Sequence, residues 1–352
     1  MRTLIRPTGF VDSPFGHDGK VARLAGGLNW FASAELIHAD GRRELVPVEG
    51  IEERFDEVMA ATWEQLTSPR APLQMGERTI RLDQPQVMGI VNVTPDSFSD
   101  GGAFADAAAA AGAGAIMAGQ GAAIVDVGGE STRPGASTVW EGDEIERVLP
   151  VVRQLAAGGT AVSIDTRKSA VMLAAIGAGA GLVNDVSGLS WDPLSAGIVA
   201  KAEVPVVLMH HQGDPQTMQD APRYDDVLVE VYEWLEERVA KTEEAGISRS
   251  KILVDPGIGF GKSVAHNLEL INGLALFHGL GCGIVIGASR KRMIGALAGE
   301  APADQRLPGS LALALKAVEQ GAQLIRVHDV AETVQALRVW RGLRDAALTP
   351  RG

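Results

Sequence analysis

The chain contains 352 residues and carries a formal net charge of −12 at pH 7. This acidic balance argues against nucleic acid or an anionic membrane surface as a partner. The single cysteine, Cys282, excludes an intramolecular disulfide framework and fits a reducing compartment. The sequence shows neither a charged-then-apolar leader nor an apolar run of membrane-spanning length. We therefore expect a cytoplasmic protein with no nucleic-acid and no membrane partner.

The first 70 residues differ in character from the rest. Residues 29–37 and 44–48 flank an Asp-Gly turn, which predicts a β-hairpin. Apolar residues from Ile51 to Leu66 then follow at helical spacing, and Ser68-Pro69 ends the run. We interpret residues 1–70 as a small N-terminal α/β appendage of unknown role, and residues 71–86 as a hairpin that leads into the main domain.

From Val87 onward the pattern is that of repeated βα units. Hydrophobic residues form 46% of the chain and aromatic residues only 5%, which suits buried parallel strands covered by alanine-rich helices. The units run to about Arg344, close to the roughly 250 residues of a (β/α)₈ barrel. We predict an α/β fold in which residues 87–352 form such a TIM barrel. The eight expected strands are 87–93, 123–127, 161–165, 181–185, 204–209, 251–255, 283–286 and 323–327.

Polar residues gather where these strands end. In this fold the carboxyl ends of the strands carry the active site, so the residues should converge there. Each alone could equally cap the helix that follows it, but eight such positions together favour a site. They are Asn92, Asp126, Asp165, Asn184 with Asp185, His210, Asp255, Ser289 to Lys291, and Arg326 with His328.

The stretch MGIVNVTPDSFSDGG at 88–102 resembles the first βα loop of the dihydropteroate synthase family, whose barrel binds pterins. Further motifs continue the resemblance in order through the barrel: GGESTRPGA at 128–136, VSIDT at 162–166, NDVS at 184–187, LMH at 208–210, DPGIGFGK at 255–262, GASRK at 287–291 and RVHD at 326–329.

The resemblance implies a transferase of folate biosynthesis. Such an enzyme condenses 6-hydroxymethyl-7,8-dihydropterin pyrophosphate with p-aminobenzoate and yields 7,8-dihydropteroate and pyrophosphate. The methylene cation is delocalised over the electron-rich pterin, so pyrophosphate can leave first in an SN1-like step, and no covalent residue is required. The resemblance also implies a Mg²⁺ cofactor, sulfonamides as inhibitors and a homodimer.

A pterin presents donors and acceptors side by side, which buried carboxylates and carboxamides read while apolar side chains sandwich the ring. By resemblance, the pterin-binding residues are Asp165, Asn184, Met209, Asp255, Phe260 and Lys291.

The pyrophosphate needs positive charge and hydrogen-bond donors. Arg326 and His328 stand two apart on the last strand, so both point to one side of it. The resemblance adds Thr132, and Asn92 as a ligand of the Mg²⁺, a hard cation that prefers oxygen. The expected catalytic set is Asn92, Asp100, Arg133, Lys291, Arg326 and His328.

By resemblance, p-aminobenzoate is surrounded by Phe98, Pro134, Phe260, Lys291 and Arg292. Position 292 departs from the commonest form, because many relatives have Ser after the lysine. Arg292 could supply a charge-assisted contact to the carboxylate, or leave that contact to backbone N–H groups.

Three alternatives are weaker. Pterin-dependent methyltransferases share the barrel but need no pyrophosphate contacts, which argues against them here. A non-catalytic paralogue should have lost some loop residues, and this chain retains the motifs. A Rossmann dehydrogenase is disfavoured because the glycine clusters lack the G-x-G-x-x-G arrangement after the first strand.

Overall fold

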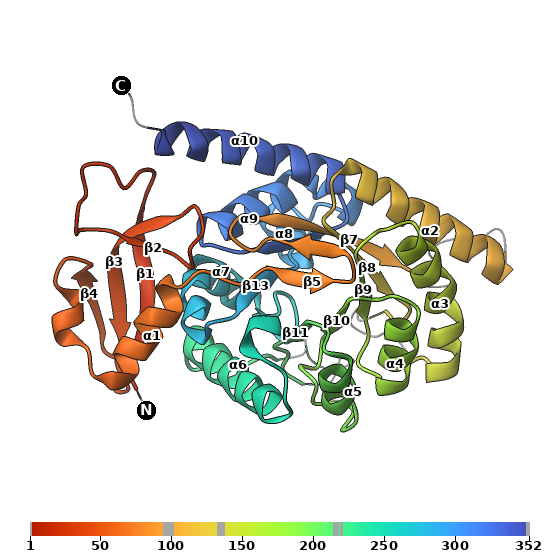
Figure 1. The fold of residues 1–352 in the computed structure, drawn as a ribbon. Helices are drawn as coiled ribbons and strands as arrows, with labels where there is room; N and C mark the ends of the chain where they lie inside the picture. The colour runs from red at the N-terminus through yellow and green to blue at the C-terminus, as the bar shows by residue number, and fades with distance from the viewer. Residues whose placement is uncertain (1, 94–101, 132–137, 214–217, 219–220, 350–352) are drawn as a thin grey trace.

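Eight parallel strands close into a barrel in the order β7 to β14, with β14 pairing back to β7 (Figure 1). The computed structural model describes residues 2–93, 102–131, 138–213, 218 and 221–349. The predicted TIM barrel is confirmed, and each expected strand overlaps an observed one. The strands are β7 (Gln86–Asn92), β8 (Ile124–Gly128), β9 (Val162–Asp165), β10 (Leu182–Asp185), β11 (Val206–Met209), β12 (Ile252–Asp255), β13 (Gly283–Ile286) and β14 (Leu324–Val327).

Helices surround the barrel and bury its outer face. Two of them begin with side-chain caps: Asp226 accepts from the N–H groups of Leu228 and Val229, and Ser263 forms a capping box with His266. The helices are α2 (Gly102–Gln120), α3 (Glu141–Ala157), α4 (Ser169–Gly177), α5 (Ser195–Ala202), α6 (Val227–Glu244), α7 (Val264–Asn272), α8 (Arg292–Leu297), α9 (Leu307–Glu319) and α10 (Val330–Leu348), with the 3₁₀ segment η4 (Leu274–Leu280) before β13. Among the described helices, none is long and apolar enough to cross a membrane.

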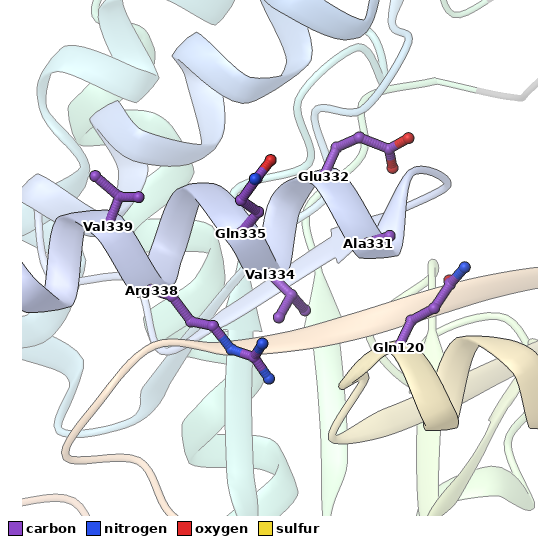
Figure 2. Close-up of a pocket in the computed structure, with 7 residues that line it drawn as sticks. All are labelled: Gln120, Ala331, Glu332, Val334, Gln335, Arg338 and Val339. Carbon is purple, nitrogen blue, oxygen red and sulfur yellow. The ribbon is translucent and has the colours of Figure 1, made fainter.

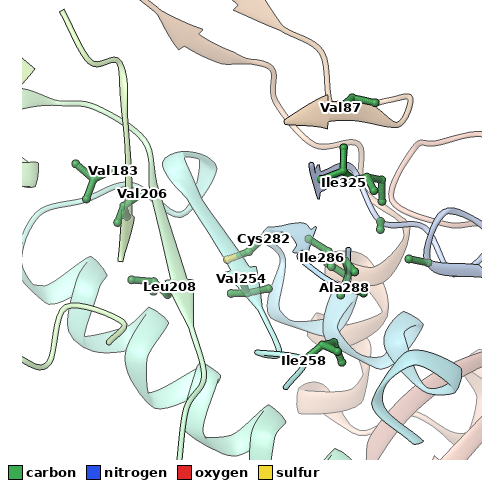
Figure 3. Close-up of a cluster of buried hydrophobic side chains, with 14 of the residues drawn as sticks. Val87, Val183, Val206, Leu208, Val254, Ile258, Cys282, Ile286, Ala288 and Ile325 are labelled. Carbon is green, nitrogen blue, oxygen red and sulfur yellow. The ribbon is translucent and has the colours of Figure 1, made fainter. Parts of the chain in front are cut away.

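Strand residues divide between two cores, because successive side chains point to opposite faces. Val206, Leu208, Val254 and Ile286 pack outward in the large core between strands and helices (Figure 3). The intervening residues pack inside the barrel in a second core, which includes Met88, Ile124, Leu182, Val207, Leu253, Val285 and Leu324.

A short hairpin covers the amino end of the barrel. It consists of β5 (Leu73–Met75) and β6 (Arg78–Ile80), paired antiparallel, and Leu73, Met75 and Ile80 join the inner core. Gly181, just before β10, lies so close that a Cβ there would meet Met75 Cα at 3.0 Å. With this end filled, the opposite end is where the barrel interior can receive a ligand.

The first 70 residues form a four-stranded antiparallel sheet and one helix. The predicted hairpin is present as β3 (Trp30–Ile37) and β4 (Arg43–Pro47), and the predicted helical stretch divides into a 3₁₀ turn, η1 (Ile51–Arg54), and α1 (Glu57–Thr67). The strands β1 (Leu4–Val11) and β2 (Ala22–Arg23) were not predicted. Pro7 and Gly9 interrupt the alternation in β1, and its pairing with β3 supplies the order that its local sequence lacks.

The N-terminal segment is joined to the barrel by buried contacts. The Arg70 guanidinium donates to the carbonyl oxygens of His278 at 2.9 Å and Cys282 at 3.0 Å. At the other side, α10 extends past the barrel towards the N-terminal sheet (Figure 1), and its Arg344 donates to Leu28 O at 2.6 Å.

Candidate active site

The inner core continues into polar side chains at the carboxyl end of the barrel. On each strand, the residue two positions after an inner-core residue, towards the carboxyl end, again faces the barrel interior. Asp126 follows Ile124, Asn184 follows Leu182, and Arg326 follows Leu324 in this way. The inward set comprises Ile90, Asp126, Asn184, Met209, Asp255, Gly287 and Arg326 at this level, and Asn92 on β7 and Asp165 on β9 one step further along, where Ser163 precedes Asp165.

Arg326 connects carboxylates across this end of the barrel. Its Nε donates to Asp126 Oδ2 at 2.6 Å and its Nη2 donates to Asp165 Oδ2 at 2.6 Å. Asn184 Nδ2 donates to the same Asp126 oxygen at 3.0 Å. The predicted residues Asp165, Asn184 and Arg326 are therefore held together through Asp126, which is fully buried.

A second group of side chains lies at the end of β12 and in the loops that follow β12 and β13. Asp255 Oδ1 accepts from Gly257 N at 2.7 Å. The Lys291 ammonium lies 4.0 Å from the centre of the Phe260 ring, a cation–π contact. Gly287, at the inner position between the groups, leaves space: a Cβ there would lie 3.8 Å from Arg326 Cδ and 3.9 Å from Asp255 Oδ2.

Burial dominates the electrostatics of both groups. It raises the pKa of Asp165 to about 7, although the Arg326 guanidinium opposes the shift. It likewise raises the pKa of Asp255 and lowers the pKa of Lys291 to about 8, against the attraction of Asp255. The cost of burying these charges is offset when a ligand supplies matching hydrogen-bond partners.

The other predicted residues are placed as follows. His328 lies beyond Arg326, and its Nδ1 is 3.1 Å from Ser289 Oγ. Met209 is buried at the end of β11, and Asn92 ends β7. Arg292 begins α8 with an exposed side chain. Five further predicted residues lie outside the described residues: Phe98, Asp100, Thr132, Arg133 and Pro134.

Asp126 is the site residue that the sequence interpretation missed, although its strand-end position was noticed. Its position along the strand could have identified it, because side chains two residues apart on a strand share a face. Asp126 stands two residues after the inward Ile124, as Asn184 does after Leu182. Its role as the shared acceptor for Arg326 and Asn184 becomes visible only in the closed barrel, where β8 lies one strand away from both β14 and β10.

An ion cluster at the carboxyl end was also missed. The Lys168 ammonium contacts the carboxylates of Glu130 and Glu144, and Arg167 Nη2 lies 2.9 Å from Glu130 Oε1. Glu130 also accepts from Val139 N at 2.8 Å. The cluster thus fixes both described flanks of segment 132–137.

One surface hollow is distinct from this group of residues. It has a volume of about 620 Å³ and lies between the end of α2 and the first half of α10, where Gln120, Val334 and Arg338 line it (Figure 2). None of its lining residues belongs to the inward set. Among the described residues, no group of three or more His, Cys, Asp or Glu side chains is arranged to hold a metal ion.

The fold corresponds to a known class. A family model described as pterin binding enzyme matches residues 88–328. The dihydropteroate synthase of Escherichia coli (strain K12) is 48% identical over 262 residues, which cover 74% of this chain and 92% of that protein. The dihydropteroate synthase of Neisseria meningitidis serogroup B is 45% identical over 275 residues, covering 77% of this chain and 96% of that protein.

Solved structures of dihydropteroate synthases are also similar to this chain. Dihydropteroate synthase from Xanthomonas albilineans with 4-aminobenzoic acid has a TM-score of 0.74 and 48% identity, and the likeness covers 78% of this chain and 98% of that one. The enzyme from the same organism in complex with 7,8-dihydropteroate has a TM-score of 0.71 and 46% identity, with coverage of 78% and 98%. The molecule is thus a pterin binding enzyme by fold and family. More narrowly, the chain belongs to the dihydropteroate synthase family and is accordingly a transferase.

Proposed function

We propose that this enzyme condenses 6-hydroxymethyl-7,8-dihydropterin pyrophosphate with p-aminobenzoate, giving 7,8-dihydropteroate and pyrophosphate. The observation that carries the proposal is the inward set, in which Asp126, Asp165, Asn184 and Asp255 share one end of the barrel with Lys291 over Phe260. Relatives solved with 4-aminobenzoic acid and with 7,8-dihydropteroate support it.

In this proposal the pterin binds deepest, among the carboxylates. Asp126 Oδ1 is buried and has no protein partner among the described residues, so it is suited to accept from a ligand N–H group. Asp255 accepts the Gly257 N–H through Oδ1, and its other carboxylate oxygen can accept from the ligand. Asn184, Met209, Phe260 and Lys291 complete the pterin-binding residues.

The pyrophosphate then lies towards the mouth, near Asn92, Thr132, Arg326 and His328. Because Arg326 is already paired with Asp126 and Asp165, it links pterin recognition to the leaving group rather than acting as a free cation. A Mg²⁺ fits this arrangement if Asn92 provides one oxygen and the pyrophosphate and water provide the rest, as this ion prefers. When bound, the ion neutralises charge on the leaving group.

The arylamine would approach from the same mouth, beside Phe98, Pro134, Phe260, Lys291 and Arg292. Loss of pyrophosphate leaves a delocalised methylene cation, so the protein's work is to orient the amine and to exclude water from the cation. Asp100 and Arg133 complete the proposed catalytic set with Asn92, Lys291, Arg326 and His328. After carbon–nitrogen bond formation the amine proton passes to solvent or to Asp100.

The test is pyrophosphate release from the pterin pyrophosphate, measured with and without p-aminobenzoate and Mg²⁺. We expect release that depends on the arylamine and is stimulated by Mg²⁺. Absence of arylamine-dependent release would overturn the synthase proposal. Methyl transfer from methyltetrahydrofolate, assayed in parallel, would then identify the methyltransferase alternative, and inactivity in both assays the non-catalytic one.

Residue roles can be separated by calorimetry with a pterin that lacks the pyrophosphate. Asp255→Ala should abolish its binding, because Asp255 reads the ring. Arg326→Ala should lower the rate of pyrophosphate release more than it weakens this ligand. Normal binding by Asp255→Ala would contradict the pterin assignment.

Two further properties belong to the proposal. We infer a homodimer, for which the exposed apolar side chains of Ile116 on α2 and of Val339 and Leu343 on α10 offer a surface. We also infer a cytoplasmic location, which the lone, buried Cys282 supports. Sedimentation would test the first, and cell fractionation the second.

A further inference from the structure

A buried lysine that the proposed chemistry does not use lies directly beside the pterin residues. Lys262 ends the loop between β12 and α7 and is only 3% exposed. Its Nζ lies 2.8 Å from His210 Nδ1 and donates to Phe260 O at 3.0 Å. Burial lowers the pKa of His210 to about 2, so its ring is neutral and Nδ1 accepts this hydrogen bond. The ammonium thus joins the end of β11 to the loop that follows β12.

The loop is packed on the backbone after β11 so tightly that glycine is required. Gly257 and Gly261 have φ values of +70° and +63°. A Cβ on Gly257 would lie 1.8 Å from His210 O, and one on Gly261 would lie 2.4 Å from Gln212 O. The Lys262 side chain reaches the same backbone, because its Nζ lies 3.5 Å from His210 O.

Two residues of the candidate site, Phe260 in the loop and Asp255 just before it, are held by different hydrogen bonds. The Phe260 carbonyl is bound by Lys262 itself, and the Phe260 ring faces the Lys291 ammonium 4.0 Å away. Asp255 is fixed separately, by its own hydrogen bond from Gly257 N. Loss of the Lys262 ammonium should therefore disturb Phe260 more than Asp255.

We infer that Lys262 is a positioning residue that sets the arylamine end of the site: held between His210 and the Phe260 carbonyl, it keeps the Phe260 ring against Lys291. This inference rests on the proposed function, in which Phe260 and Lys291 contact p-aminobenzoate. The pterin retains Asp126, Asp165, Asn184 and Asp255, none of which depends on this lysine through a described hydrogen bond.

The first test is Lys262→Met in the full-length enzyme, which keeps the length of the side chain and removes the ammonium. The KM for p-aminobenzoate should rise at least about tenfold, as misplaced positioning groups commonly cause, while the KM for the pterin pyrophosphate changes less than about threefold. Lys251→Met is the matched control, because its Nζ also donates to a carbonyl, Glu203 O at 2.8 Å, but on the surface before β12. It should leave both constants unchanged.

A second pair of variants tests the same contact without touching the lysine. His210→Gln retains an acceptor and should behave like the wild type, whereas His210→Leu removes it and should reproduce Lys262→Met. The double variant Lys262→Met/His210→Leu should be no worse than Lys262→Met alone, because both break one contact. If Lys262→Met fails to fold, the comparison of the two His210 variants decides whether the contact between Lys262 and His210 sets the KM for p-aminobenzoate.

Three results would overturn the inference: an unchanged KM for p-aminobenzoate, an equal rise in both KM values, or equal behaviour of His210→Gln and His210→Leu. Amide hydrogen exchange of residues 257–262 provides a readout that needs no catalysis. Exchange there should accelerate about tenfold in Lys262→Met and not in Lys251→Met. If the wild type lacks synthase activity, the proposed function fails, and the exchange result still decides whether Lys262 holds the loop.

Discussion

At the scale of single residues, Asp126 is the centre of the polar group inside the barrel. It is buried and accepts from both Arg326 Nε and Asn184 Nδ2 through one oxygen. A buried carboxylate is stable only when it is paired and hydrogen-bonded, and removal of one partner leaves the other charge under-compensated. The sequence marks Asp126 as a strand-end residue but gives no sign of which residues it contacts.

We predict that Asp126→Ala lowers the free energy of unfolding by about 3 kcal/mol, because Arg326 loses one of its two buried carboxylate partners. Asp126→Asn should lose less, since an amide oxygen can still accept both hydrogen bonds. Urea denaturation measures the differences. Asp83→Ala is the control, because Asp83 pairs with Arg81 on the surface and should cost about 0.5 kcal/mol or less. Equal costs for Asp126→Ala and Asp83→Ala would contradict the prediction.

Lys291 should give the reaction a pH dependence. Burial lowers its pKa to about 8, against the attraction of Asp255. A lysine is charged below its pKa, so the ammonium is largely present at pH 7 and lost as the pH rises towards 9. The KM for the anionic p-aminobenzoate should therefore increase roughly tenfold over this range.

The comparison for this prediction is Lys291→Arg, whose guanidinium stays charged throughout. Whatever its absolute value, the KM of this variant should vary little between pH 7 and pH 9. Steady-state kinetics with saturating pterin pyrophosphate measures both profiles. Parallel profiles for the two proteins would mean that another group is titrating.

At the scale of elements, the loop after β12 depends on its glycines more than on any side chain. Gly257 has φ +70°, and a Cβ there would lie 1.8 Å from His210 O. Because that oxygen belongs to the backbone at the end of β11, the clash cannot be relieved unless the loop or the end of β11 moves, and either movement would displace a strand of the barrel.

We predict that Gly257→Ala costs about 3 kcal/mol or more of the free energy of unfolding, since backbone strain and a steric clash add. Gly246→Ala separates the two effects, because Gly246 also has a positive φ of +95° but has no atom within 4 Å of the added Cβ. That variant should cost only about 1–2 kcal/mol, from the backbone conformation alone. Thermal unfolding of both variants measures the difference, and similar losses would argue against the clash.

The barrel strands could be predicted from the sequence because each is a short, mostly apolar run with polar residues or glycine at or just after its end, as in Ile252–Asp255 and Leu182–Asp185. The strand β1 could not, because Pro7 and Gly9 break its pattern and only pairing with β3 defines it. The inward direction of Arg326 also follows from its parity. That Arg326 contacts Asp126 and Asp165 does not follow from the sequence, because β14 pairs with β13 and β7 rather than with β8 or β9. Contacts across the interior depend on how the barrel closes.

At the scale of the whole molecule, the N-terminal sheet is integrated with the barrel rather than attached by a linker. The relatives match over nearly their whole length but cover only 74–78% of this chain, so about a quarter of it lies outside the likeness. The sheet has its own core around Phe31 and Leu66, and that core includes Ala275 from η4 of the barrel. A core shared in this way couples the stability of the two parts.

Arg70 is where this coupling can be tested. Its guanidinium donates to Ser68 O at 2.9 Å as well as to His278 O and Cys282 O, and burial lowers its pKa to about 10. Arg70→Met retains the apolar stem but leaves the buried carbonyls of His278 and Cys282 without this donor. We predict a loss of about 3 kcal/mol in the free energy of unfolding, because each unsatisfied buried carbonyl costs about 1–3 kcal/mol. The turnover of the folded protein should be unchanged, since Arg70 contacts no residue of the inward set.

The matched control is Arg78→Met, whose Nε also donates to a carbonyl, Gly159 O at 2.8 Å, but at an exposed site. Water can replace that donor, so the midpoint of urea denaturation should hardly move. If the N-terminal sheet is coupled to the barrel through Arg70, the fluorescence of Trp63 in α1 and the activity of the barrel should be lost at the same urea concentration when Arg70 is present. The fluorescence is followed in a background in which the other five tryptophans are replaced by Phe. In Arg70→Met the fluorescence change should come first, because the sheet has lost its buried hydrogen bonds to the carbonyls of His278 and Cys282. Coincident transitions in Arg70→Met at the wild-type midpoint would show that the shared apolar core alone joins the two parts.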